Sequence, residues 1–332
     1  MKKSINIVVI LTFIGVLFLG NTQLVSANGA NFSVKGILPD NQKKEGVSYF
    51  DFELAPKEEK IIEVEVSNNS DTQQNYVIGV NTATTNMNGV IDYGESDTYD
   101  DTLSISMDEI ATFEPNLTLD SGETKNVPIR LLMPDKKFEG ILLGGISIAE
   151  VLQEQQETQI ANQFSYSIAL VLSQGNSVPT IDLAMPKVVV EQINRRNVIS
   201  ANIQNKSASI VNNLSVEARI YRDKKEKPLY YQEGEQMRMA PNSNFNFGVS
   251  TNNQPLKAGK YTMVVKATDD DQEWEWEKEF EIKEDEAQKL NKTAVELEND
   301  NLVLYLAIGA ALVSLTLIIV IVILIKKNRK KV

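Results

Sequence analysis

Short runs in which apolar and polar residues alternate fill this chain from Asn31 to about Glu284. No long stretch there carries apolar residues at the helical spacing of three, four and seven. Alternation with a period of two puts the apolar side chains on one face of a strand, and turn-forming residues separate the runs. The clearest runs are 47–54, 61–66, 76–80, 127–131, 214–220, 245–249 and 261–267. The pattern is typical of antiparallel β-sandwiches, so we expect an all-β fold.

The two halves of this region share a layout. In each half a strand leads into a polar turn, Asn68-Asn69-Ser70 or Asn205-Lys206-Ser207, and a second strand returns. We therefore predict two tandem Ig-like antiparallel β-sandwich domains, over 28–150 and 164–284. Residues 151–163 form either a linker or the tip of a long hairpin, because the segments on both sides are strongly apolar.

The start of the chain has the features of a secretory signal peptide. Lys2 and Lys3 precede an apolar run over 5–19, and small residues follow at 25–27. An N-terminal membrane anchor, the alternative, needs about 18 or more apolar residues. We expect a signal peptide over 1–27.

The other end carries a longer apolar segment. Residues 302–325 have no charged side chain, and five cations follow within 326–332. A segment of this length predicts one transmembrane helix, with a cytoplasmic basic tail and extracellular N-terminal domains. A buried core helix is the alternative. The charged segment 285–301 predicts a short helical stalk, and the expected location is the plasma membrane of a Gram-positive bacterium, crossed once.

Composition limits the chemistry that the chain can perform. It has no cysteine and no histidine, which excludes Ser-His-Asp and Cys-His catalysis and ordinary zinc sites. A predicted extracellular region without cysteine, anchored by a segment with a short basic tail, is typical of Gram-positive surface proteins. Between the two terminal segments all 45 Asp and Glu remain but only 26 of the 33 Lys and Arg, a net charge of about −19. Such a surface repels nucleic acid and attracts a basic partner.

Two groups of residues are candidate partner-binding positions. Gly140, Gly144 and Gly145 lie in an apolar run without the ending of a phosphate-binding loop, and glycine inside a strand marks a bulge or a close backbone approach. If these glycines are functional, they leave a flat strand edge open to β-augmentation. Trp274 and Trp276 share one face of a predicted strand. Their rings belong either to the core or to an exposed platform for a sugar or a protein.

Acidic residues gather in one predicted loop. They are Asp92, Glu95, Asp97, Asp100 and Asp101. Calcium takes oxygen ligands of this kind, but the spacing is not that of an EF-hand. These acids are weak candidates for a metal site, and a solvated loop is the alternative. We predict no cofactor.

Four stretches of the sequence carry a resemblance to a known family. They are Phe-Ser-Val-Lys-Gly-Ile-Leu-Pro-Asp-Asn-Gln at 32–42, Tyr-Phe-Asp-Phe-Glu-Leu-Ala-Pro at 49–56, Phe-Glu-Gly-Ile-Leu-Leu-Gly-Gly-Ile-Ser-Ile at 138–148 and Leu-Lys-Ala-Gly-Lys-Tyr at 256–261. With these stretches the chain resembles the WxL-interacting proteins of Gram-positive bacteria. The resemblance implies a peptidoglycan-binding domain over about 31–150 and a host-binding domain over about 161–284. It brings over no catalytic residues.

The resemblance also implies partners and a function. We predict a surface scaffold, not an enzyme, that docks a WxL-domain protein by strand-edge pairing on the first domain. Peptidoglycan is a further expected ligand there, and an extracellular-matrix protein of a host is the expected ligand of the second domain. The alternatives are a structural spacer without a ligand and a carboxylate-based cell-wall hydrolase, which would need an acid with a raised pKa in a buried cleft.

Overall fold

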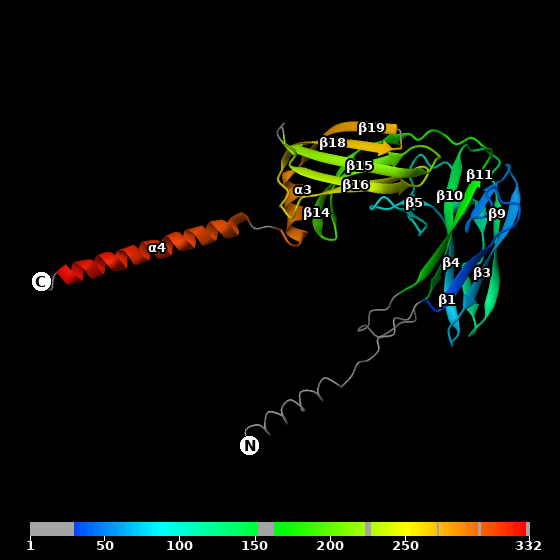
Figure 1. Cartoon of the computed structure of the whole chain (residues 1–332), viewed down its shortest axis with the longest axis horizontal. Helices are drawn as coiled ribbons and strands as arrows, with labels where there is room; N and C mark the ends of the chain where they lie inside the picture. The colour runs from blue at the N-terminus through cyan, green and yellow to red at the C-terminus, as the bar shows by residue number, and fades with distance from the viewer. Residues whose placement is uncertain (1–29, 152–162, 223–226, 271, 298–299, 330–332) are drawn as a thin grey trace, which may run out of the picture.

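The computed structural model describes residues 30–151, 163–222, 227–270, 272–297 and 300–329, with the side chains of the last segment described for 307–321. Two β-sandwiches form the folded part, and Figure 1 shows their strands running in crossed directions. The predicted signal peptide and most of the predicted segment 151–163 lie outside the described residues.

The first sandwich contains two sheets with the strand orders β1-β3-β9-β7 and β2-β11-β10-β4-β8. Every pair in them is antiparallel except β2–β11, which is parallel. The pair β5–β6 and the one-turn helix α2 complete this part. The bounds are β1 Phe32–Ile37, β2 Phe50–Glu53, β3 Glu59–Asn68, β4 Gln74–Thr82, β5 Thr84–Thr85, β6 Ile91–Asp92, α2 Met107–Ile110, β7 Ala111–Thr112, β8 Asn116–Leu119, β9 Thr124–Leu132, β10 Ile141–Glu150 and β11 Ser165–Ser173.

Strand β11 lies in the first sandwich, although the sequence placed 164 at the start of the second. It pairs with β10 from Ile141↔Ser173 to Ala149↔Ser165, and its Leu170 and Leu172 are buried in the first core. Strands β10 and β11 are therefore antiparallel neighbours in one sheet of the first sandwich.

The second sandwich also contains two sheets. In one, β14 pairs with β12 and β13 on one side and with β17 on the other, and the other sheet has the order β16-β15-β18-β19. The bounds are β12 Leu183–Ala184, β13 Val188–Ile193, β14 Arg196–Asn205, β15 Val211–Arg222, β16 Tyr230–Met239, β17 Ser243–Ser250, β18 Gly259–Asp269 and β19 Gln272–Ile282.

Alternation along the strands decides which faces meet. In β3, Ile62, Val64 and Val66 are buried, whereas Ile61 is 59% exposed. In β15, every second residue from Leu214 to Ile220 is buried. Each sandwich thus packs one apolar face of each sheet against the other, which gives two separate apolar cores.

A buried asparagine closes the same corner in both sandwiches. Asn68 ends β3, where the chain crosses to the other sheet, and its Nδ2 donates to the carbonyls of Thr72, Leu119 and Asp120 at 2.8, 3.2 and 2.9 Å. Asn205 ends β14, and its Nδ2 donates to the carbonyls of Ser209 and Ala240 at 2.8 and 3.0 Å. Each amide therefore joins two inter-sheet turns of its sandwich.

The predicted helical stalk over 285–301 needs correction. Helix α3 (Glu284–Thr293) packs on the second sandwich, because Ala287 is buried in its core and Leu290 lies against that core. The side chain of Asn291 exchanges two hydrogen bonds with the backbone of Leu256, at 2.8 and 2.9 Å. These contacts make α3 part of the domain.

The predicted membrane helix also needs correction. Helix α4 spans Asp300–Arg329. No helix in the described part of the chain is both long and apolar enough to cross a bilayer. This finding contradicts the transmembrane helix at 302–325, the cytoplasmic tail at 326–332 and the single-pass plasma-membrane location. The predicted fold class is wrong in this respect, and the described chain is mostly β.

The buried corners generate a first prediction. Asn205→Ala removes the side-chain donor to the buried Ser209 carbonyl, one of the two donors to the Ala240 carbonyl and the acceptor of Ser207, so we expect the free energy of unfolding of the second sandwich to fall by about 2–3 kcal/mol. Urea denaturation followed by tryptophan fluorescence measures it, because the two tryptophans of the chain lie at 274 and 276.

Lys206→Ala is the matched control. The Lys206 side chain is exposed, and its ion pair with Asp182 lies in solvent, so its loss should change the same free energy by less than about 1 kcal/mol. Equal midpoints for the two variants would contradict the role given to the buried amide.

Candidate functional site at the domain junction

A closed ring of hydrogen bonds joins the two sandwiches. The Ala240 amide donates to Thr85 Oγ1 at 3.0 Å, and Ser243 Oγ donates to the Ala240 carbonyl at 2.8 Å. Since that bond uses the one hydroxyl proton of Ser243, Thr85 Oγ1 is the donor in the 2.6 Å bond between the two hydroxyls. All three residues are buried, so the ring works in an environment with little competing water.

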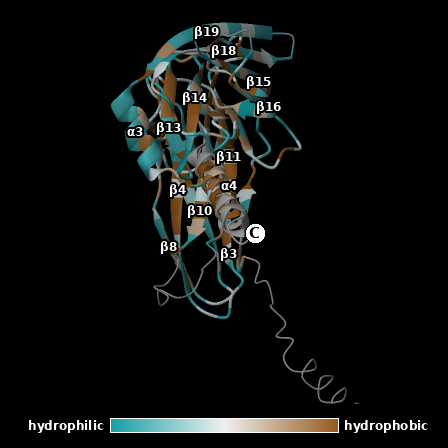
Figure 2. Ribbon diagram, turned by 90° about the vertical axis from the view of Figure 1, so that its left-hand side faces the viewer, coloured by the Kyte–Doolittle hydropathy of each residue, from teal (hydrophilic) through white to brown (hydrophobic). Residues whose placement is uncertain are grey.

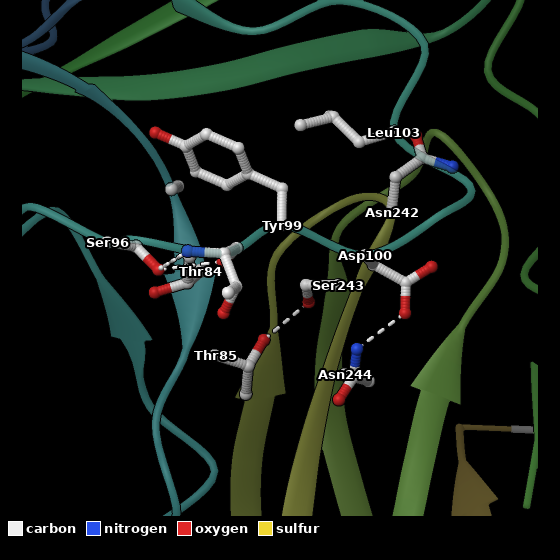
Figure 3. A pocket seen from close by; sticks show the side chains of 11 residues that line it. Thr84, Thr85, Ser96, Tyr99, Asp100, Leu103, Asn242, Ser243 and Asn244 are labelled. Carbon is white, nitrogen blue, oxygen red and sulfur yellow. Dashed lines mark hydrogen bonds between the residues drawn. The ribbon is translucent and has the colours of Figure 1, made fainter.

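Asp100 forms a second polar link across the junction. Its carboxylate accepts hydrogen bonds from the amide and hydroxyl of Thr102, and from the side-chain amides of Gln204 and Asn244 in the second sandwich. The Asn244 bond is 2.5 Å long and is drawn in Figure 3. Burial raises the pKa of Asp100, but the hydrogen bonds from Thr102, Asn244 and Gln204 outweigh burial, so the pKa lies below its ordinary value of 3.8.

Apolar and backbone contacts complete the junction. Ala83, Leu143 and Ala240 form a small buried cluster that belongs to both sandwiches. Nearby, the Ile141 amide donates to the Ala208 carbonyl at 2.8 Å, and the Arg238 amide donates to the Gly89 carbonyl at 2.7 Å. These apolar and backbone contacts connect strands and short turns of the two sandwiches directly at the junction.

A polar pocket of about 230 Å³ opens beside these bonds. Its lining comes from Ala83–Thr85, from the loop over 96–103 and from 242–244, and Figure 3 shows the loop facing the strands of the second sandwich. Hydroxyl and amide groups dominate the lining, with the ring of Tyr99 beside them. The Tyr99 hydroxyl donates to Asp108 Oδ2 at 3.0 Å, and burial, followed by this bond, raises the pKa of Tyr99.

The size and lining of the pocket limit what can enter. It is smaller than the roughly 300–1,000 Å³ of pockets that hold drug-sized molecules, so one sugar unit or one side chain of a larger ligand fits best. Hydroxyl and amide groups can exchange hydrogen bonds with sugar hydroxyls or peptide amides, and an aromatic ring can pack against a sugar face.

The three candidate glycines lie at close contacts and not at an open edge. Gly144 and Gly145 are in β10, between β4 and β11. A Cβ at Gly144 would come within 2.6 Å of the Asn81 carbonyl oxygen, and one at Gly145 within 2.5 Å of the Tyr93 side chain. Gly140 has a φ of +79° and faces the Ala208 backbone. These glycines allow α2, Tyr93 and the second sandwich to approach the sheet.

The two candidate tryptophans lie on β19, an edge strand of the second sandwich. Both are partly buried and pack against the second core. Both side chains therefore contribute to the core, although β19 is an edge strand of the sheet.

The acidic candidates do not gather into a metal site. Asp100 is used in the junction, and Asp92 Oδ1 accepts a hydrogen bond from the Gly94 amide at 2.9 Å. Asp97 and Asp101 are exposed. Within the described residues, no group of three or more metal-binding side chains lies close enough to hold an ion.

Sequence reasoning missed most of the junction. Thr85, Gln204, Ser243 and Asn244 lie in ordinary strands with no motif around them, so nothing in the sequence indicated that they meet. Asp100 was singled out, but as one acid among several. The signal available was its neighbour Thr102, because an acid two residues before a threonine favours an Asx turn that fixes the carboxylate.

Two family models match the chain one after the other. The peptidoglycan-binding domain of the WxL Interacting Protein matches residues 32–150, and the host-binding domain of the same protein matches residues 155–292. Together they cover most of the chain. The chain belongs to the WxL-interacting protein family. The second match begins at 155, so it includes β11, a strand that packs in the first sandwich.

Solved structures that resemble the chain weakly include several bacterial chaperones. The chaperone–tip adhesion subunit complex of the Csu pili of Acinetobacter baumannii is 14% identical, with 75% of this chain and 98% of that chain covered and a TM-score of 0.31. The Pseudomonas aeruginosa CupB2 chaperone is 14% identical, covering 68% and 95%, with a TM-score of 0.28. The E. coli chaperone DraB is 15% identical, covering 70% and 94%, with a TM-score of 0.27. No curated protein matches the chain.

Asp100 generates a pH-dependent prediction. A carboxyl group whose pKa is lowered by folding stabilises the protein above its unfolded pKa, and this stabilisation is lost as the pH falls through the folded pKa. We expect Asp100→Asn to lower the free energy of unfolding by about 1–2 kcal/mol at pH 7. The asparagine NH2 group is a donor, so it cannot accept the hydrogen bonds that a carboxylate oxygen accepts from Gln204 and Asn244. The difference from the wild type should shrink as the pH falls below 3.8.

Urea titrations between pH 7 and pH 3 measure this effect. Asp101→Asn, at the exposed neighbouring acid, is the control and should match the wild type throughout. A constant difference between wild type and Asp100→Asn across that range would show that the carboxylate charge is not what stabilises the junction.

Proposed function

We propose that this chain is a non-enzymatic surface scaffold that binds peptidoglycan, docks a WxL-domain protein and presents its second domain to a host or matrix protein. The family descriptions name two binding domains, which supports binding over catalysis. The observation that carries the proposal is the junction pocket, because residues of both family domains line it.

Peptidoglycan suits this pocket by its chemistry. Its glycan carries hydroxyl and acetamido groups, and its stem peptides carry amides, all of which exchange hydrogen bonds with hydroxyls and amides like those of Ser96, Thr98 and Asn242. The lining from the peptidoglycan-binding domain supplies most of these groups together with the Tyr99 ring. A single sugar or stem residue would enter, and the rest of the polymer would run over the surface.

A fixed junction also suits a scaffold. The hydrogen-bond ring and the Asp100 link hold the two domains in one relative position, so a ligand on one domain and a partner on the other are kept at a set separation. A structural spacer without a ligand needs the same rigidity. A scaffold and a spacer therefore differ in whether the chain binds peptidoglycan or a partner protein.

The ring of Tyr99 provides the test of the proposal. We expect Tyr99→Ala to weaken retention of the purified full-length chain on insoluble peptidoglycan by at least about fivefold, because a stacked ring contributes on the order of 1 kcal/mol or more. Tyr99→Phe is the matched control. It should bind within about twofold of the wild type, because the lost hydroxyl contacts Asp108 and not the ligand.

The same co-sedimentation assay is run with a purified WxL-domain protein in solution as a second arm, and urea midpoints confirm that each variant is folded. Saturable binding of the wild type in both arms supports the scaffold. Folded wild type that binds neither peptidoglycan nor the WxL-domain protein would falsify the proposal and leave the spacer.

A further inference from the structure

Strand β19 is a long edge without a neighbour on one side. It pairs with β18 over its whole length, from Gly259↔Ile282 to Asp269↔Gln272, and β18 is its one strand partner in the described part of the chain. In an antiparallel pair every second residue turns its N–H and C=O away from the neighbouring strand. Figure 2 shows β19 as a hydrophilic ribbon at the top margin of the molecule, and the backbone groups turned away from β18 have no strand partner in the described part of the chain.

The two faces of β19 differ sharply in chemistry. Five glutamates alternate along the solvent face, and all are exposed: Glu273, Glu275, Glu277, Glu279 and Glu281. Lys266 of β18 pairs with Glu273 at 2.9 Å, and it is the one ion pair of this row among the described residues. The row therefore keeps most of its negative charge available to a partner.

The other face of β19 is mostly apolar. Trp274, Trp276 and Phe280 are partly buried and pack against the second core. Lys278 stands in the same row, and its Nζ donates to the carbonyls of Met185 and Pro186 in the facing sheet. An added strand beside β19 would thus have glutamates on one face and aromatic rings on the other.

We propose that β19 is a docking edge for an extended segment of a partner protein in which basic residues alternate with small or apolar ones. The backbone of that segment would continue the sheet, its basic side chains would lie opposite the glutamates, and its other side chains would contact the tryptophans. The inference goes beyond the proposed function because it places a protein-binding site on the second domain, away from the junction pocket.

Charge decides against a second copy of this chain as the occupant. Two β19 strands paired edge to edge would bring one glutamate row alongside the other, and like charges opposite each other destabilise a strand pair. A basic segment meets no such repulsion.

The test uses synthetic ten-residue peptides and the full-length chain. The probe peptide alternates lysine and threonine, and tryptophan emission reports its binding, because both tryptophans of the chain are on β19 and the peptide has none. We expect saturable binding. A peptide with the same composition, but with all five lysines before the threonines, should bind at least about tenfold more weakly.

Two further peptides separate strand pairing from simple charge attraction. One carries N-methyl groups on its threonine amides and the other on its lysine amides. Only every second residue of an added strand bonds to the edge. One methylated peptide should therefore lose at least about tenfold in affinity while the other binds like the probe. Equal affinities of the two, retained or lost, would overturn the inference.

Variants of the chain locate the site. The triple variant Glu275→Gln, Glu277→Gln, Glu279→Gln should bind the probe at least about tenfold more weakly, because three exposed charge pairs are removed. The matched control, Asp92→Asn, Glu95→Gln, Asp97→Asn, makes the same change of net charge at exposed positions of the first domain. It should bind within about twofold of the wild type, and equal loss in both triple variants would show that only net charge attracts the peptide.

This result is separable from that of the junction pocket. Retention on peptidoglycan does not involve β19, so the glutamine triple variant should keep it even where peptide binding is lost. Conversely, Tyr99→Ala should leave the affinity for the probe peptide unchanged.

Discussion

Carbonyl groups buried where the chain crosses between sheets need donors, and two asparagine side chains provide them. Asn68 and Asn205 each join two inter-sheet turns of their sandwich. In the second sandwich one of these turns contains Ala240, whose carbonyl also accepts from Ser243 and whose amide donates to Thr85 of the first sandwich. The corner that closes one domain is thus the place where the other domain attaches. The position of the junction, and of the pocket beside it, follows from the need to satisfy one buried turn.

The glycines of β10 serve the same junction from the other side. Side chains at Gly144 and Gly145 would displace Met107 and Tyr93, which pack directly on the sheet, and Tyr93 belongs to the layer next to the shared apolar cluster. At Gly140 a side chain would meet the backbone of Ala208, one residue before the buried Ser209. Close backbone approach explains all three positions.

The sequence predicted the strands well because alternation is a local signal. Runs such as 61–66 and 214–220 are strands whose apolar positions are buried, and the Asn-x-Ser turns of the two halves have matching hydrogen bonds. Long-range pairing has no such signal. Nothing local shows that Thr85 meets Ser243, that β11 returns to the first sandwich, or that Leu290 turns helix α3 onto the second core. The apolar stretch 302–325 predicted a membrane-spanning helix, but no helix in the described part of the chain is both long and apolar enough to be one.

Open edges are a hazard for β proteins, and the described edges differ in how they are protected. Strands β2, β7 and β8 have four residues or fewer, which gives little backbone to pair with. Strand β19 has eleven residues, so its glutamates and not a short length oppose pairing with a second copy of β19. Five like charges in a row lower stability through mutual repulsion, so a shorter or mixed edge would protect the domain at a smaller cost. An edge that stays long and carries one sign of charge on its solvent face excludes copies of itself while leaving its backbone open to a strand of opposite charge, and this selectivity is what a docking edge requires.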